Sequence, residues 1–174
     1  MPDDQHWVGT WATAPAPAEG AAFINQTLRM TARTSLGGDT VRVRLSNAYG
    51  SRKLTVGAAR VALRDKGPGI VSASDRKLTF GGAATATIAA GALLVSDPVA
   101  LDLPPLADVA VSIYLPEELP PSFGITGRYA RQTNYVSPPG DFTSSVVMPV
   151  GQIPAIGILS AVSMSSLRLR QVGS

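Results

Sequence analysis

Glycine and proline recur along the whole chain and leave room only for short elements of regular structure. The 174 residues include 17 Gly and 14 Pro, spread from one end to the other. Between these breakers, apolar residues alternate with polar ones, which is the period of a strand with one buried face. No window carries a sustained apolar stripe of helical period. The pattern therefore predicts many short strands and very little helix.

The clearest strand is the segment 40–46. Val41, Val43 and Leu45 fall on one face of such a strand, and two arginines fall on the other. The segment 23–34 before it is rich in strand-forming residues and leads into the turn-like sequence Leu36–Asp39. We therefore expect the two segments to form a β-hairpin.

Further strands are predicted near 54–63, 77–80, 84–88, 93–95, 99–101, 109–115 and 132–136. Pairs of prolines at 104–105, 120–121 and 138–139 are expected at joints between elements. So many short strands with antiparallel turns predict an all-β domain, an antiparallel two-sheet β-sandwich of jelly-roll-like form. We expect residues 1–150 to make up this domain.

Residues 151–174 form an atypical tail. The segment Ser163–Arg170 mixes periods and is consistent with a last strand, a short basic helix or a frayed end. GC-rich codons for Val162–Ser166, read in another frame, give Leu-Asp-Val-Val, and the codons that follow can encode a linker-like string. A frameshift-derived tail, with loss of a following domain, is therefore a further hypothesis.

Composition narrows the class of protein. A content of 45% hydrophobic and 16% charged residues argues against disorder, and the absence of an apolar run near 18 residues argues against a membrane span. The net charge of +3 comes from scattered cations, so nucleic-acid binding is not expected. The first five residues are polar and acidic, unlike a secretory signal, and the compartment stays open.

Residues for catalysis, metal binding or cofactor binding are scarce. His6 is the only histidine and there is no cysteine, so neither a Ser-His triad nor the usual zinc set is well supplied. The glycine turns at 67–69 and 81–82 match no phosphate-binding or dinucleotide-binding motif, and we expect no cofactor. Calcium binding by turn aspartates is the open alternative for a metal, at Asp39, Asp97, Asp102 and Asp141. A glycosidase would need two convergent carboxyl groups, drawn from Asp75, Asp97, Asp102, Glu117, Glu118 and Asp141.

Aromatic and planar polar side chains are the residues with which β-sandwiches bind sugars, because rings stack on the pyranose face and amides or guanidinium groups bond the hydroxyls. Trp7 and Trp11, four residues apart, are expected on one strand face, packing the core or its edge. The candidate ligand-binding residues are Asn47, Tyr49, Arg131, Gln132, Asn134 and Tyr135.

Five segments in one order, within residues 5 to about 148, resemble the N-terminal region of bacterial SGNH/GDSL-type hydrolases. They are Trp7–Ala12 (WVGTWA), Asn25–Arg29 (NQTLR), Val41–Gly50 (VRVRLSNAYG), Ser96–Val99 (SDPV) and Arg131–Asp141 (RQTNYVSPPGD). The resemblance implies a β-sandwich placed before an α/β/α domain that carries the catalytic serine, the oxyanion donors and an Asp-x-x-His motif. The chain departs from the family in lacking Gly-Asp-Ser, since its nearest segment is Gly38–Thr40 (GDT). No catalytic residue of the family is carried over.

The sequence thus predicts a non-catalytic accessory domain that binds a carbohydrate or a small ester substrate. The alternative is a small autonomous hydrolase, either a glycosidase with two carboxylates or an esterase. A third reading is an assembly module, because surface normally covered by the missing hydrolase domain would favour a homo-oligomer. Relatives implied by the resemblance are often secreted, which leaves the location of this chain undecided.

Overall fold

The computed structural model of the chain describes residues 7–12, 23–119, 133–151 and 162–168. Within these residues the regular elements are strands and one short 3-10 helix, η1 (Ser72–Ser74). The strands are β1 (Trp7–Trp11), β2 (Gln26–Arg33), β3 (Gly38–Ser46), β4 (Leu54–Val56), β5 (Ala58–Leu63), β6 (Arg76–Lys77), β7 (Ala86–Ile88), β8 (Leu93–Val95), β9 (Val99–Leu103), β10 (Asp108–Leu115), β11 (Tyr135–Pro139) and β12 (Val162–Arg168). No described residue belongs to a helix long and apolar enough to cross a membrane.

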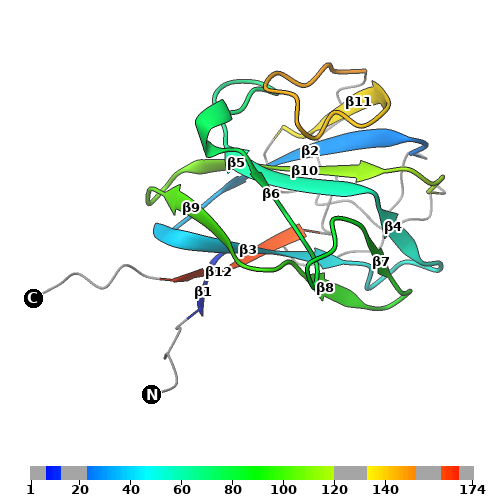
Figure 1. Cartoon of the computed structure of the whole chain (residues 1–174), viewed down its shortest axis with the longest axis horizontal. Helices are drawn as coiled ribbons and strands as arrows, with labels where there is room; N and C mark the ends of the chain where they lie inside the picture. Colours follow the sequence, from blue (N-terminus) through cyan, green and yellow to red (C-terminus); the bar gives the residue numbers. More distant parts are fainter. Residues whose placement is uncertain (1–6, 13–22, 120–132, 152–161, 169–174) are drawn as a thin grey trace, which may run out of the picture.

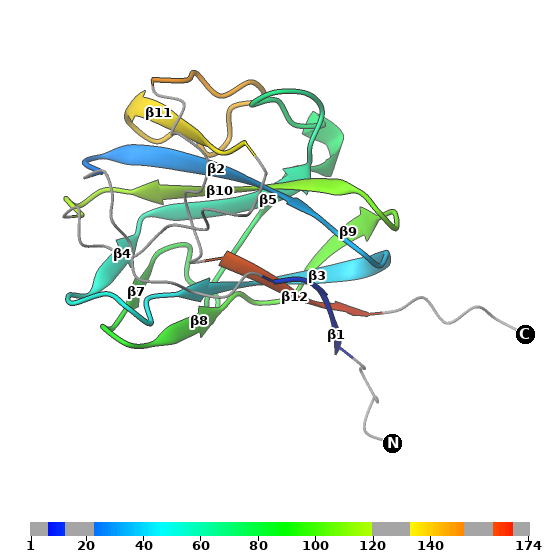
Figure 2. The same cartoon turned by 180° about the vertical axis from the view of Figure 1, so that it is seen from behind.

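Two antiparallel sheets lie face to face (Figures 1 and 2). In the first, here the β3 sheet, the order is β1-β12-β3, and both β8 and β9 pair with the other edge of β3. In the second, here the β10 sheet, the order is β11-β2-β10-β5-β6, and β4 and β7 form a separate small pair. The predicted all-β sandwich is confirmed.

The core lies between the two sheets and is built from alternate strand residues. Val41, Val43 and Leu45 of β3 are at most 2% exposed, while Arg42 and Arg44 lie on the opposite face. Val109 and Val111 of β10 belong to the same buried cluster. The alternation predicted for 40–46 is confirmed, and its physical cause is the removal of one face of the strand from water.

The predicted hairpin of 23–34 with 40–46 is wrong. β2 pairs with β10 and β11, whereas β3 pairs with β12, β8 and β9, so the chain crosses from one sheet to the other at residues 34–37. This corner, residues 34–37, is stabilised by hydrogen bonds to other segments of the chain. Thr34 N–H donates to the Ala107 carbonyl, and Ser35 N–H donates to the Thr10 carbonyl. Crossing lets the apolar faces of both strands meet across the core rather than lie side by side.

The same crossing recurs between β9 and β10 and between β11 and β12. The β2–β3 segment is therefore flanked on one side by β9–β10 and on the other by β11–β12, an interleaving typical of a jelly roll. The predicted strand 54–63 is divided at Gly57 into β4 and β5. The strand predicted near 132–136 is β11, which begins at Tyr135.

The proline pairs behave differently from one another. Pro104-Pro105 stands between β9 and β10, as predicted. Pro138-Pro139 forms the last two residues of β11, so the strand reaches through the pair and the joint comes after it. β11 is an edge strand among the described strands, with a register shift between Val136 and Pro139, where a missing N–H is tolerated. The pair at 120–121 lies outside the described residues.

The tail contributes a strand to the sandwich. Of the three conformations considered for it, the structure has a strand, β12, and this strand lies between β1 and β3 in the middle of the β3 sheet. The frameshift origin of the tail stays a hypothesis.

Candidate functional site

Asn47 fixes the turn that follows β3. Its side chain is buried, and its Nδ2 donates to the carbonyls of Arg52 at 2.9 Å, Ile88 at 3.0 Å and Ala89 at 3.0 Å. Its backbone carbonyl accepts from the N–H groups of Gly50 and Gly91. Asn47 therefore ties the 47–53 turn to the 88–92 turn, and its side chain holds the backbone in place.

The position of the Asn47 side chain also explains why residue 50 is a glycine. Among the described residues, Asn47 Oδ1 is buried without a hydrogen-bond partner, and it points at Gly50. A Cβ at position 50 would stand 1.8 Å from this oxygen, so the turn closes only over glycine. The tight packing of amide against backbone makes the turn a rigid support for Tyr49.

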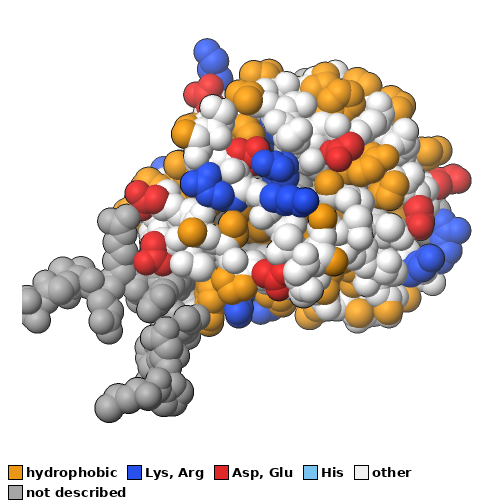
Figure 3. All heavy atoms as spheres, viewed as in Figure 1, with side chains coloured by type: hydrophobic (Ala, Val, Ile, Leu, Met, Phe, Trp, Pro, Cys, Tyr) orange, Lys and Arg blue, Asp and Glu red, His pale blue; other side chains and the backbone are white. Residues whose placement is uncertain are grey.

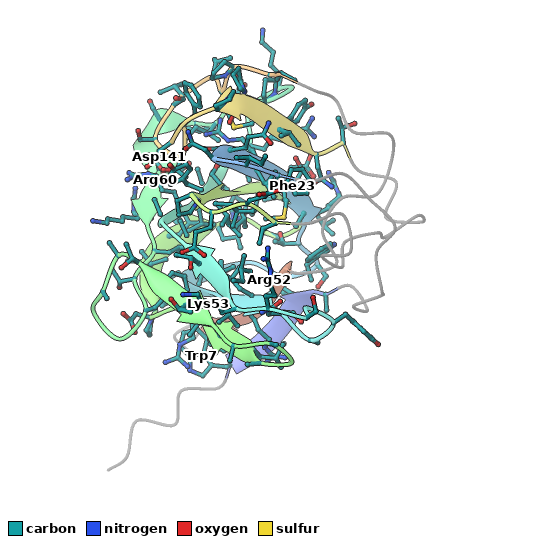
Figure 4. All side chains as sticks on the ribbon, turned by 90° about the vertical axis from the view of Figure 1, so that its right-hand side faces the viewer. Trp7, Phe23, Arg52, Lys53, Arg60 and Asp141 are labelled. Atoms are coloured by element: carbon teal, nitrogen blue, oxygen red, sulfur yellow. The ribbon has the colours of Figure 1, made fainter. Side chains whose placement is uncertain are left out.

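Tyr49 stands on this support with 53% of its surface exposed. The following residues Ser51, Arg52 and Lys53 are also exposed. Arg52 Nη2 donates to the Glu118 carbonyl at 3.3 Å, which connects the turn to the segment leaving β10. We call the residues 47–53, 88–92 and 116–119 the loop end; Figure 4 looks at this end of the sandwich, with Arg52 and Lys53 labelled.

The remaining predicted ligand residues lie elsewhere. Asn134 Oδ1 accepts the backbone N–H of Thr31 at 3.2 Å, and Tyr135, 8% exposed, is paired with Arg29 across β11 and β2. The structure thus places Asn47 and Tyr49 together at one turn and Asn134 and Tyr135 on the edge of the other sheet. Arg131 and Gln132 lie outside the described residues. Ligand binding by all six stays a prediction.

Arg29 is a buried polar hub that the sequence did not single out. Its side chain lies on the outer face of the β10 sheet, 1% exposed. Nε donates to Ser112 Oγ at 2.8 Å, Nη1 to the Pro68 carbonyl at 2.6 Å, and Nη2 to the Ser145 and Thr143 carbonyls at 2.8 and 3.3 Å. Burial lowers the pKa of the guanidinium to about 10, so it stays charged at neutral pH. Through these four hydrogen bonds, Arg29 fastens two covering loops to the sheet.

The two tryptophans lie on opposite faces of β1, not on one face as expected. Trp11 packs against the core cluster, whereas the Arg42 guanidinium lies 4.2 Å from the ring centroid of Trp7 on the outer side of the β3 sheet. The change of face comes from the shift between Gly9 and Trp11, where β1 carries one extra residue and its alternation is displaced by one; the shift between Val8 and Gly9 has its extra residue on β12. One face of the Trp7 ring is therefore occupied by a cation.

Several carboxyl groups considered for catalysis or calcium binding hold the fold instead. Asp97 accepts from Thr79 Oγ1 at 2.7 Å and from the N–H groups of Gly82 and Gly81 at 2.8 and 3.0 Å. These bonds, with that of Gly82 the strongest, lower the pKa of Asp97. Asp75 Oδ2 pairs with Arg60 Nη2 at 2.8 Å, and Asp141 Oδ1 accepts from both the N–H and the Oγ1 of Thr143.

No candidate metal centre emerges from the part of the chain that is described. No three His, Cys, Asp or Glu side chains come together there in a group that could hold an ion. On the face that Figure 3 presents, Lys and Arg side chains are interspersed with Asp and Glu. His6, the single histidine, lies outside the described residues.

No model of a known protein family matches the chain, and no curated protein matches it. The resemblance to SGNH/GDSL-type hydrolases therefore depends on the five sequence segments alone. The site must be judged from its own geometry.

Proposed function

We propose that the chain is a non-catalytic accessory module, related to the N-terminal sandwich of SGNH/GDSL-type hydrolases, that binds a carbohydrate or a carbohydrate ester at the loop end. The observation that carries the proposal is the half-exposed ring of Tyr49 on a turn held by buried Asn47. This is the part of the predicted ligand set that is both exposed and rigidly supported.

A rigid aromatic side chain suits a sugar ring. Stacking of a phenol on a pyranose face removes apolar C–H surface from water, and a support that is already ordered reduces the entropy lost on binding. Arg52 and Lys53, exposed on the same turn as Tyr49, carry donors for hydroxyl or ester carbonyl oxygens. One guanidinium N–H of Arg52 is used by Glu118, and the group carries further donors.

The state of Asp97 supports a non-catalytic role. A glycosidase needs one carboxyl group with a raised pKa, so that it is protonated and can donate to the leaving group. The pKa of Asp97 is shifted in the opposite direction, by bonds that favour the carboxylate. Asp75 Oδ2 is in an ion pair with Arg60 Nη2 at 2.8 Å.

The test is a titration of the chain with soluble oligosaccharides and their acetylated forms, followed by calorimetry and by NMR. Replacing Tyr49 with Ala is expected to weaken binding about tenfold or more, the equivalent of roughly 1.4 kcal/mol, whereas Tyr49→Phe keeps the ring and most of the affinity. The matched control is Leu106→Ala, which removes a side chain 61% exposed at the opposite end of the sandwich, beside the start of β3. If no sugar in the series binds the parent chain, or if Tyr49→Ala binds as tightly as the parent, the proposal is wrong.

A further inference from the structure

The strand β12 fills a slot one strand wide between β1 and β3, although it is the last described strand in the chain (Figure 2). It pairs with β3 at Val162↔Leu45 and Met164↔Val43, and with β1 at Trp7↔Arg168 and Trp11↔Met164. Among the described residues, β1 pairs with no other strand. The slot is therefore bordered on both sides by backbone groups that, within the described part of the chain, β12 alone satisfies.

The ladders of β12 are irregular on both sides. Its pairing with β1 shifts register twice, around Gly9, and its pairing with β3 shifts between Met164 and Leu167. In contrast, β10 pairs with β2 from Asp108↔Arg33 to Leu115↔Gln26 without a shift. We expect a strand with interrupted ladders to open at a lower free energy than one with regular ladders, so β12 should leave the sandwich more readily than β10.

The end of β1 at Thr10 and Trp11 is attached to the body by contacts that do not involve β12. Thr10 Oγ1 donates to the Leu36 carbonyl at 3.0 Å, and the Thr10 carbonyl accepts from Ser35 N–H at 3.0 Å and from Ser35 Oγ at 2.9 Å. Trp11 packs against the core. With β12 displaced, the slot would present two unpaired strand edges, one on β1 and one on β3.

Unpaired edges bind another strand, and the strand that reproduces every lost contact is the same segment of a second copy. We propose that the slot between β1 and β3 accepts β12 from a second chain, which yields a strand-exchanged dimer. Each half of the dimer keeps the β12 pairings of the closed chain, so the balance between one chain and two depends on concentration. The inference is independent of ligand binding at the loop end.

The test uses the natural absence of cysteine from the chain, which makes every introduced thiol unique. Arg44 and Ser163 are direct partners on β3 and β12, and Arg44 is exposed. Partners in an antiparallel pair have Cα atoms about 4.5–5.5 Å apart, within the range that a disulfide bridges. The matched control is the pair Arg33 and Asp108, also partners at the surface, on the regular β2–β10 ladder.

Two full-length single variants, R44C and S163C, are mixed in the folded state at high concentration and then oxidised. We expect a product of twice the 18.0 kDa chain mass, in which proteolytic peptides analysed by mass spectrometry show a disulfide joining position 44 of one chain to position 163 of the other. The mixture of R33C with D108C is expected to give no such product above the collisional background. Light scattering of the unaltered chain should show a reversible shift from one mass to twice that mass as concentration rises.

The double variant R44C/S163C, oxidised in dilute solution, establishes the pairing within one chain. It is expected to close internally at monomer mass with no free thiol. Internal closure of this variant without a mixed product from the two single variants would overturn the proposal. Failure of the double variant to close would overturn it too, because β12 would then not occupy the slot.

Discussion

At the scale of single residues, polar side chains do the work that regular secondary structure does elsewhere. Asn47 satisfies the backbone of two turns, Arg29 holds two loops on the outer face of a sheet, and Asp97 caps the Gly81-Gly82 turn. Each of these side chains bonds backbone groups that no strand ladder reaches, and a buried backbone group without a partner would be costly. Asn47 and Asp97, which the sequence offers for binding or chemistry, thus also hold the fold in place.

The contribution of Asp97 to the stability of the fold is expected to depend on pH. Its pKa in the folded chain is below the ordinary 3.8, so its stabilising contribution is complete above that value and is lost as pH falls through the lower folded pKa. We expect Asp97→Asn to melt at a lower temperature than the parent at neutral pH, and the gap to close on acidification towards about pH 2. Circular dichroism melts across this range measure it. Glu117→Gln, an equal change of charge at an exposed position, is the control for the effect of net charge on the melts. A gap between Asp97→Asn and the parent that stays constant with pH would contradict the assignment.

At the scale of elements, the sequence predicts strands well and their partners poorly. Alternation in 40–46 depends on one strand and one core, and it is visible in the residue order. The strand partners of the segment 23–34 are decided by contacts at the corner after it, where Thr34 and Ser35 bond to Ala107 and Thr10. Those partners are remote in sequence, so the residue order of the segment does not reveal them. The same limit applies to the candidate site. Tyr49 could be predicted from the sequence as an exposed aromatic residue, whereas the burial of Asn47 depends on hydrogen bonds to the carbonyls of Ile88 and Ala89, which are distant in sequence.

The corner between β2 and β3 offers a test of the crossing. A Cβ on Gly37 would lie 2.7 Å from the Leu103 carbonyl oxygen and 2.7 Å from the Pro105 nitrogen, and backbone atoms cannot move aside cheaply. We expect Gly37→Ala to lower the free energy of unfolding by about 1–3 kcal/mol, as overpacking does. Urea denaturation measures the loss. Gly9→Ala is the control, since nothing lies within 4 Å of its added methyl group, and equal stability of both variants would mean that the corner is open as in a simple hairpin.

At the scale of the whole molecule, the choice between an accessory module and an autonomous hydrolase depends on proton transfer. Among the described candidates, Asp75, Asp97 and Asp141 are occupied in an ion pair, a turn cap and a threonine cap. We therefore expect purified chain to hydrolyse nitrophenyl acetate and nitrophenyl glycosides no faster than buffer, and substitution of any one carboxyl residue to leave that rate unchanged. Spectrophotometric release of nitrophenol is the measurement. An enzyme-like rate that is abolished in a single Asp or Glu variant and survives His6→Ala would establish a glycosidase, whereas a rate lost in His6→Ala would establish an esterase that uses the one imidazole of the chain.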